Sequence, residues 1–189
     1  VLGTSGTATE GTDYTDGSGN VDDITISAGS TSGTVSFTPT DDSVYEGNET
    51  ATIAISSVTG EASESGTQAV TITITENESA PTVTLAVSAT SIAENAGSSL
   101  TLTATLSGAT NADVTVALST SGTATEGTDY TDGSGNVDDI VISAGSTTGT
   151  VSFTPSDDSI YEDDESATIA ISSVSGGSAT ESGTQTVTI

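Results

Sequence analysis

The stretch Thr40-Asp41-Asp42-Ser43-Val44-Tyr45-Glu46-Gly47-Asn48-Glu49-Thr50 returns later in the chain as Ser156-Asp157-Asp158-Ser159-Ile160-Tyr161-Glu162-Asp163-Asp164-Glu165-Ser166. With an offset of 116, residues 1–60 match residues 117–176 at 50 of 60 positions. A period of this length corresponds to a whole domain and not to one turn of a solenoid. The 189 residues therefore hold about 1.6 copies of one domain, so one copy is incomplete.

These two stretches, residues 40–50 and 156–166, are called the acidic boxes below. Each contains the pattern D-D-x3-E-x2-E, whose four carboxylates follow directly after a segment of alternating residues. Ca²⁺ prefers a dense cluster of oxygen ligands, and crowded carboxylates repel one another unless a cation lies among them. The alternative is a solvated loop in a chain that is acidic throughout. We interpret the boxes as Ca²⁺ ligands.

The strongly negative charge of the chain argues against nucleic acid and anionic membranes as binding partners. The chain has 27 Asp and Glu but no Lys, Arg or His, which gives a net charge of −27. It lacks the cationic side chains that bind nucleic acid or anionic membrane surfaces, and it has no apolar run long enough for direct membrane insertion. Cysteine is absent too, which excludes disulfides and zinc–thiolate sites. Metal ions are the obvious substitute for disulfides in an extracellular setting.

Alternation of apolar and polar residues predicts the strands. The segments with this pattern are 24–26, 34–38, 51–55 and 69–75 in the first copy, and 83–87, 100–106, 114–118, 140–142, 151–153, 167–171 and 187–189 after it. Thr faces outward in most of them, while Val and Ile form the core. Phe37 and Phe153 fall on the core side, and Tyr45 and Tyr161 are interpreted as core plugs. About seven short strands without a helical period indicate an all-β, antiparallel β-sandwich.

The alternation stops at Glu76–Pro81, and Pro81 cannot donate to a central strand ladder. We therefore expect residues 1–76 to be the C-terminal part of one domain, residues 77–80 to be a short linker, and residues 81–189 to be a nearly complete second domain. Val1 aligns with Ala117, so the strands within residues 73–116 have no counterpart in the first copy. The core of the first copy is predicted to be open.

Three motifs together resemble the Calx-beta family over essentially the whole chain. They are Ser91-Ile92-Ala93-Glu94-Asn95-Ala96-Gly97, Gly122-Thr123-Ala124-Thr125-Glu126-Gly127-Thr128-Asp129-Tyr130, and the acidic box with its closing Thr-Ile-Thr run. That family has an immunoglobulin-like sandwich and occurs in sodium/calcium exchangers, in integrin β4 and in large secreted bacterial surface proteins. The resemblance implies tandem immunoglobulin-like domains, with Ca²⁺ held by loops at one end near the junction with the next domain.

The resemblance also implies a set of ligands, carried over motif by motif. In the second copy these are Glu94, Asp129, Asp157, Asp158, Glu162 and Glu165, and in the first copy Asp13, Asp41, Asp42, Glu46 and Glu49. Many members end their last strand with an acidic triplet of the D-N-D type. Here Glu76-Asn77-Glu78 keeps two carboxylates, Glu76 and Glu78, on longer side chains.

Asp16–Asp23, repeated as Asp132–Asp139, places oxygen side chains at alternate positions, as an EF-hand loop does. It lacks the glycine at the sixth position and the bidentate glutamate at the twelfth. A plain hairpin loop is therefore favoured for this segment.

Three functions remain to be weighed. The leading hypothesis is a structural repeat of a secreted cell-surface adhesin, stalk or extracellular fibre, rigidified by Ca²⁺, because near-identical copies suit a spacer. Its partners would be neighbouring repeats, in the same chain or through strand complementation by another chain. The alternative is a calcium-sensing regulatory domain that signals to a partner protein. An enzyme is disfavoured, because the chain offers no His, Cys or Lys as base or nucleophile.

Overall fold

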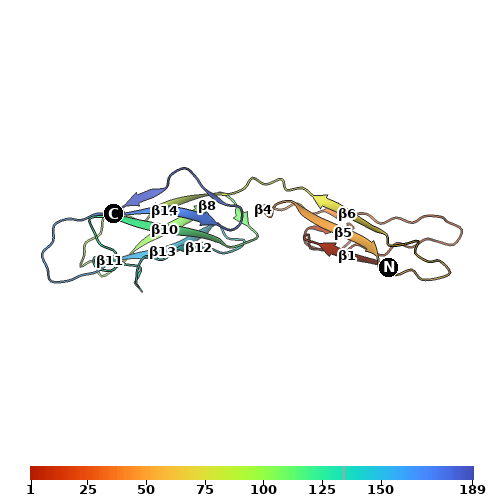
Figure 1. Ribbon diagram of the computed structural model, residues 1–189, viewed down its shortest axis with the longest axis horizontal. Helices are drawn as coiled ribbons and strands as arrows, with labels where there is room; N and C mark the ends of the chain where they lie inside the picture. Colours follow the sequence, from red (N-terminus) through yellow and green to blue (C-terminus); the bar gives the residue numbers. More distant parts are fainter. Residues whose placement is uncertain (134) are drawn as a thin grey trace. The chain divides into compact units, whose positions relative to one another are not determined.

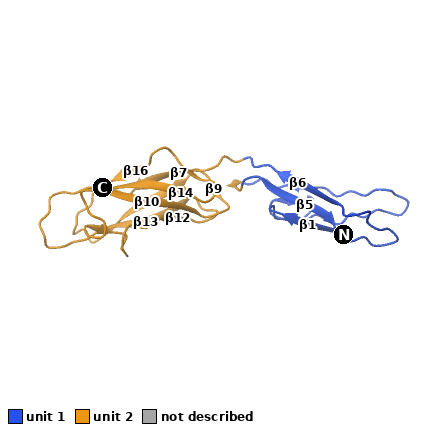
Figure 2. Ribbon diagram, viewed as in Figure 1, with its two compact units in different colours: residues 1–42, 47–77 blue, residues 43–46, 78–189 orange. Residues whose placement is uncertain are grey.

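The computed structural model describes residues 1–133 and 135–189, and every regular element within these ranges is a β-strand (Figure 1). The predicted all-β fold is confirmed. The chain forms two compact units (Figure 2). Unit 1 comprises Val1–Asp42 and Gly47–Asn77, and unit 2 comprises Ser43–Glu46 and Glu78–Ile189. The middle of the first acidic box thus groups with unit 2.

Unit 2 contains two main sheets. The four-stranded sheet has the order β12-β10-β14-β16, and the five-stranded sheet has the order β11-β13-β8-β7-β15. The strands are β7 (Thr82–Val87), β8 (Leu100–Leu106), β10 (Val114–Gly122), β11 (Tyr130–Thr131), β12 (Ile140–Ile142), β13 (Thr148–Pro155), β14 (Ala167–Ser175), β15 (Thr180–Glu181) and β16 (Thr186–Thr188). Their pairs are antiparallel except for β15 with β7. A short parallel pair, β4 (Val44–Tyr45) with β9 (Ala109–Thr110), completes the unit.

The core of unit 2 lies between the inner faces of these sheets. Along β8, Leu100, Leu102, Ala104 and Leu106 are buried, whereas Thr101 and Thr105 are exposed. Strands β10, β12 and β14 contribute further buried Val and Ile side chains. Successive residues of a strand point to opposite faces, so strict alternation puts one whole face into the core. Each such aliphatic side chain stabilises the fold by about 1.5–3 kcal/mol when fully buried.

Unit 1 is a smaller assembly. Its main sheet has the order β1-β5-β6, formed by β1 (Leu2–Gly6), β5 (Glu49–Ile55) and β6 (Ala69–Ile74). A second pair joins β2 (Tyr14–Thr15) to β3 (Thr38–Pro39). The buried apolar residues are Ala8, Tyr14 and Ala51, with Val21, Phe37 and Ile74 packed against them. Phe37 stacks on Tyr14 with ring centroids 4.7 Å apart.

Two strands predicted in the first copy are wrong for most of their length. Residues 24–26 form no strand, and of residues 34–38 only Thr38 belongs to one. The equivalent residues of the second copy form β12 and β13, which pair with Val114–Val116 of β10 and with β8. Both partner segments precede Ala117 and have no counterpart in the first copy. Accordingly Ile24 and Ile26 are 38% and 57% exposed, whereas Ile140 and Ile142 are fully buried.

This difference predicts where proteolysis begins. We expect subtilisin to cleave within residues 21–37 well before it cleaves the equivalent residues 137–153, because backbone outside a strand ladder opens at little cost. Mass spectrometry of fragments from a digestion time course measures the order of cleavage. Trypsin is unsuitable, since the chain has no Lys or Arg. Equal protection of the two segments would contradict the prediction.

Candidate metal centre

Asp129 is held by the backbone of its own turn and by the neighbouring strand. Its Oδ2 accepts a hydrogen bond from the Thr125 N–H at 2.6 Å, and its carbonyl accepts one from the Ser156 N–H at 2.9 Å. The next residue, Tyr130, is buried and stacks on Phe153 with ring centroids 4.5 Å apart. The core therefore fixes the position of this carboxylate.

Glu162 and Glu165 approach Asp129 from the second acidic box. Glu165 lies just before Ser166, whose carbonyl accepts hydrogen bonds from the N–H groups of Thr123 and Ala124. One carboxylate oxygen from each of Asp129, Glu162 and Glu165 lies within 4.8 Å of the other two. Two oxygens bound to one Ca²⁺ at 2.3–2.6 Å can be at most about 5 Å apart. The three carboxylates, called the Asp129 group below, therefore fit a single cation.

The first copy repeats this arrangement. Carboxylate oxygens of Asp13, Glu46 and Glu49 also lie within 4.8 Å of one another, and each residue precedes its counterpart in the Asp129 group by 116 positions. Asp13 makes the same local bond, since its Oδ2 accepts from the Thr9 N–H at 2.6 Å. The same turn thus presents the same carboxylate in both copies.

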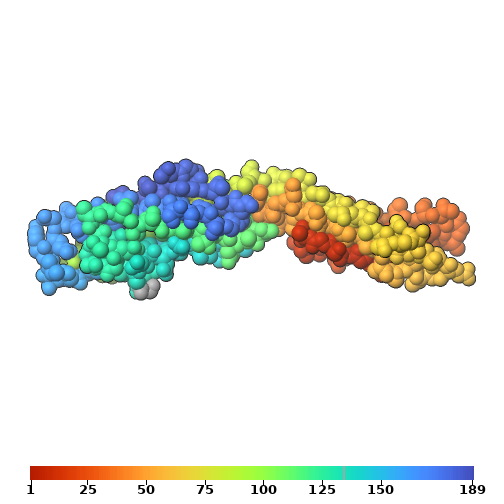
Figure 3. All heavy atoms as spheres, in the orientation of Figure 1, coloured from red at the N-terminus to blue at the C-terminus, as the bar shows by residue number. Residues whose placement is uncertain are grey.

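A hollow of about 710 Å³ opens beside the second acidic box, which appears in light blue at the left of Figure 3. Acidic residues on its wall are Glu94, Asp129, Glu162, Asp163, Asp164 and Glu165. Glu94 also joins two loops, because its Oε1 accepts from the Asp158 N–H at 3.0 Å. Sequence reasoning did not select Asp163 and Asp164. They replace Gly47 and Asn48 of the first copy, so comparison of the two boxes gave no sign of them.

The fold and the repeated acidic groups agree with a comparison against protein families, in which the model of the Calx-beta domain matches residues 2–78 and 76–189. The chain belongs to the Calx-beta family. The resemblance noted in the sequence is thereby confirmed. A search of curated proteins found no match to the chain. Within residues 1–133 and 135–189, no helix is long and apolar enough to span a bilayer.

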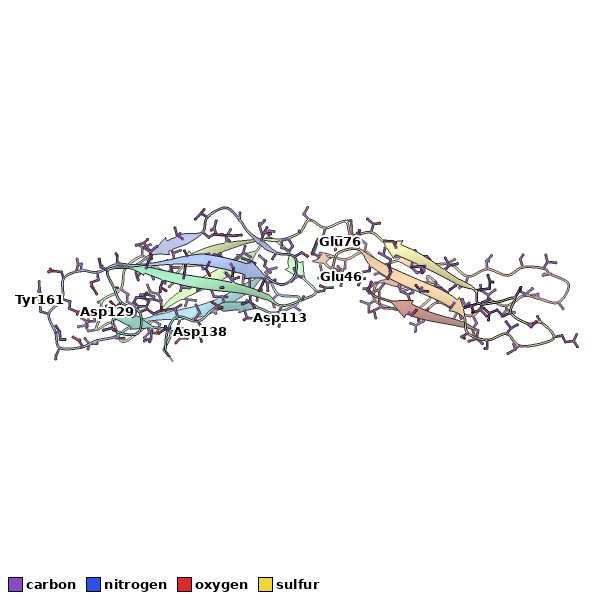
Figure 4. All side chains as sticks on the ribbon, in the orientation of Figure 1. Glu46, Glu76, Asp113, Asp129, Asp138 and Tyr161 are labelled. Carbon is purple, nitrogen blue, oxygen red and sulfur yellow. The ribbon has the colours of Figure 1, made fainter. Side chains whose placement is uncertain are left out.

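The remaining carboxylates that the Calx-beta resemblance implied lie outside the two groups, as far as the described residues show; they are Asp41, Asp42, Glu76, Glu78, Glu94, Asp157 and Asp158. Some of them order the loops. Asp41 accepts from Asn77 Nδ2 at 2.8 Å. Glu76, labelled in Figure 4, accepts from the Gly47 N–H at 2.6 Å. Asp158 accepts from the Ile160 N–H at 2.6 Å.

The Asp16–Asp23 segment forms a turn that the side chain of Asp16 stabilises. Asp16 Oδ1 accepts from the N–H and hydroxyl of Ser18 and from the Gly19 N–H. The bonds from Ser18 are the main reason why the pKa of Asp16 is lowered. Of its repeat, Asp132–Asp139, Ser134 lies outside the described residues.

The interpretation of Tyr161 as a core plug is wrong, because its side chain is 89% exposed (Figure 4). Its counterpart Tyr45 is half-buried and lies in β4, which pairs with β9. The residue type is the same in both copies. Tyr45 is more buried than Tyr161 because its strand pairs with β9.

The electrostatics of the Asp129 group are those of crowded anions. Partial desolvation raises the pKa of Glu162, and repulsion from the charges of Asp129, Asp158, Glu165 and Glu94 raises it further. Desolvation also raises the pKa of Glu165, together with the charge of Asp129 and a hydrogen bond to it. A bound cation would remove this repulsion.

These pKa shifts predict how the free energy of unfolding depends on pH when a chelator keeps the protein free of metal. A raised carboxyl pKa means that the folded state binds more protons than the unfolded state, whose pKa is near 4.5. The stabilisation that Glu162 and Glu165 contribute to the folded state is therefore present below that pH. It is lost as the pH rises through their raised folded-state pKa values. Urea denaturation in EDTA from about pH 4 to about pH 7 measures the slope.

The Glu162→Gln/Glu165→Gln double variant is the comparison for this slope. It should lose less stability than the parent protein across the same range, since two of the repelling charges are gone. Identical slopes for the two proteins would show that these carboxylates do not titrate abnormally in the folded state.

Gly122 tests how the second acidic box is positioned. Its φ is +131°, and a Cβ there would lie 2.1 Å from the carbonyl oxygen of Ser166. We expect Gly122→Ala to lower the free energy of unfolding by about 2–4 kcal/mol, because the backbone next to Glu165 must move. Gly108→Ala is the matched control, since a Cβ at Gly108 meets nothing within 4 Å. Equal stability of the two variants in thermal and urea melts would refute the close approach.

Proposed function

We propose that this chain is part of a long extracellular or cell-surface adhesin, stalk or fibre, in which each Calx-beta repeat is a structural module rigidified by Ca²⁺. The observation that carries the proposal is the recurrence of one carboxylate triplet in both copies. Asp13, Glu46 and Glu49 meet in the first copy, and Asp129, Glu162 and Glu165 meet in the second. A ligand set copied with its repeat suits a spacer whose modules share one task.

The position of the Asp129 group explains how an ion would stiffen the module. Asp129 directly precedes β11, which pairs with β13 in the five-stranded sheet. Glu165 lies two residues before β14, which belongs to the four-stranded sheet. An ion held by both would tie the two sheets together at one end of the sandwich. That tie would do the work of a disulfide in a chain that has no cysteine.

The same reading accounts for the setting and the partners. Extracellular calcium modules bind in the range of about 10⁻⁴–10⁻³ M, which matches a site built from a few solvent-accessible carboxylates. With no cationic side chain, the protein depends on outside cations to offset its charge. Its partners in this proposal are neighbouring repeats, and no catalytic activity is assigned.

Calcium should stabilise the protein beyond any effect of ionic strength. Binding to the folded state alone adds RT ln(1 + [Ca²⁺]/Kd), about 2.7 kcal/mol at a hundredfold excess over Kd. We therefore expect the melting temperature to rise with CaCl₂ far more than with NaCl of equal ionic strength. An equal rise of the melting temperature in NaCl would show that the acidic boxes are solvated loops without a calcium site.

Matched variants locate the ligands. Glu162→Gln/Glu165→Gln should remove most of the calcium-dependent gain contributed by the second copy, since it neutralises two members of the Asp129 group. Asp157→Asn neutralises a carboxylate of the same box that lies outside the group, and it should leave the gain intact. Isothermal titration and melting curves with CaCl₂ measure both. The opposite ranking of these variants would place the site around Asp157 and Asp158.

A further inference from the structure

Strand β9 of unit 2 has one edge fixed by the unit's own loops and another occupied by β4. The Thr110 carbonyl accepts from the Gly145 N–H at 2.8 Å, and Thr110 is buried. On the β4 side, Val44 lies opposite Ala109 and Tyr45 opposite Thr110, and the Asn111 N–H donates to the Tyr45 carbonyl at 3.3 Å. The middle of the first acidic box is thus an added strand.

The equivalent segment of the second box, Ser159–Glu162, pairs with no strand in the described residues. Ser159-Ile160-Tyr161-Glu162 differs from Ser43-Val44-Tyr45-Glu46 only in Ile for Val. Ile160 is 65% exposed and Tyr161 is 89% exposed, whereas Val44 and Tyr45 are half-buried. Ser159 and Ile160 form a bend in this chain, but a β-branched residue next to an aromatic one, both exposed, suits addition to a sheet edge.

We propose that Ser159–Glu162 is a docking strand that adds, in parallel, to the β9 edge of a further Calx-beta repeat. The occupant follows from the chain itself, because the nearly identical segment 43–46 is seated on β9 in this register. The inference rests on the proposed function only in assuming that a further repeat is present. Charge also favours it: Ser107–Ala112 around β9 carries no carboxylate, so a strand flanked by acidic residues meets little repulsion there.

One difference between the boxes bears on the strength of docking. Gly47 follows β4 with φ +79°, a conformation in the left-handed region, and Asp163 takes its place in the second box. Asp tolerates that region better than most residues but less readily than Gly. Asp163→Gly should therefore strengthen docking of the second box, and Gly47→Asp should loosen β4 in the first.

The test compares the 189-residue chain with a longer one in which residues 73–189 are appended after Ile189, which aligns with Ile72. Hydrogen exchange is followed by mass spectrometry with CaCl₂ present throughout. In the 189-residue chain, the amides of 43–46 should be protected and those of 159–162 should exchange freely. In the longer chain, exchange at 159–162 should slow by at least about tenfold. Unchanged exchange there, with the appended copy shown to be folded by its slow core amides, would overturn the proposal.

A matched pair of variants tests the register. Asn111→Pro in the appended copy removes the N–H that corresponds to the donor to Tyr45, and it should abolish the new protection of 159–162. Asn111→Ala keeps that N–H and should preserve it. Equal effects of the two variants would contradict the docking register.

Nitration of tyrosine gives an independent readout. Tyr14 and Tyr130 are buried, so Tyr161 should be the most reactive tyrosine of the 189-residue chain and should become shielded in the longer one. Docking is read at 159–162, whereas the calcium proposal is read from the melting curves of the ligand variants. A chain that docks without a calcium response, or responds to calcium without docking, would therefore separate the two proposals.

Discussion

Each carboxylate of this chain has to find its hydrogen-bond donors among backbone N–H groups, amides, hydroxyls and water, because Lys, Arg and His are absent. In the second copy, backbone N–H groups supply several of these donors. Glu126 accepts from the Val137 N–H at 2.7 Å and Asp129 from the Thr125 N–H at 2.6 Å. Such charge-assisted bonds hold the loops that surround the site. Asp129, Glu162 and Glu165 nevertheless lie close enough to repel one another, and a bound cation would remove that repulsion.

The loops reach these positions because the sandwich brings distant segments together at its end. Tyr130 and Phe153 stack in the core and set the turn that carries Asp129, while β14 sets the end of the box that carries Glu165. A cation at this point would join loops from both sheets. It would act on the part of the fold where strand hydrogen bonds have already ended.

One short segment of the first copy takes part in both a strand pair and a carboxylate triplet. The middle of its acidic box, Val44–Tyr45, pairs with β9, and the adjoining Glu46 contributes an oxygen to the repeated carboxylate triplet. An ion bound there would therefore restrict the same few backbone dihedral angles that strand pairing restricts.

Local sequence alone determined the all-β class, the repeat and the acidic boxes, since alternation such as that of Leu100–Leu106 and a 116-residue offset need no long-range information. Only the tertiary structure decided which carboxylates meet. Asp129 reaches Glu162 and Glu165 across more than 30 residues, a contact that ligand spacing within the box does not encode. The same limit applies to strands: Ile24–Ile26 and Ile140–Ile142 are almost identical, yet only the latter forms a strand. A strand exists through hydrogen bonds to a neighbour, and the neighbour lies elsewhere in the chain.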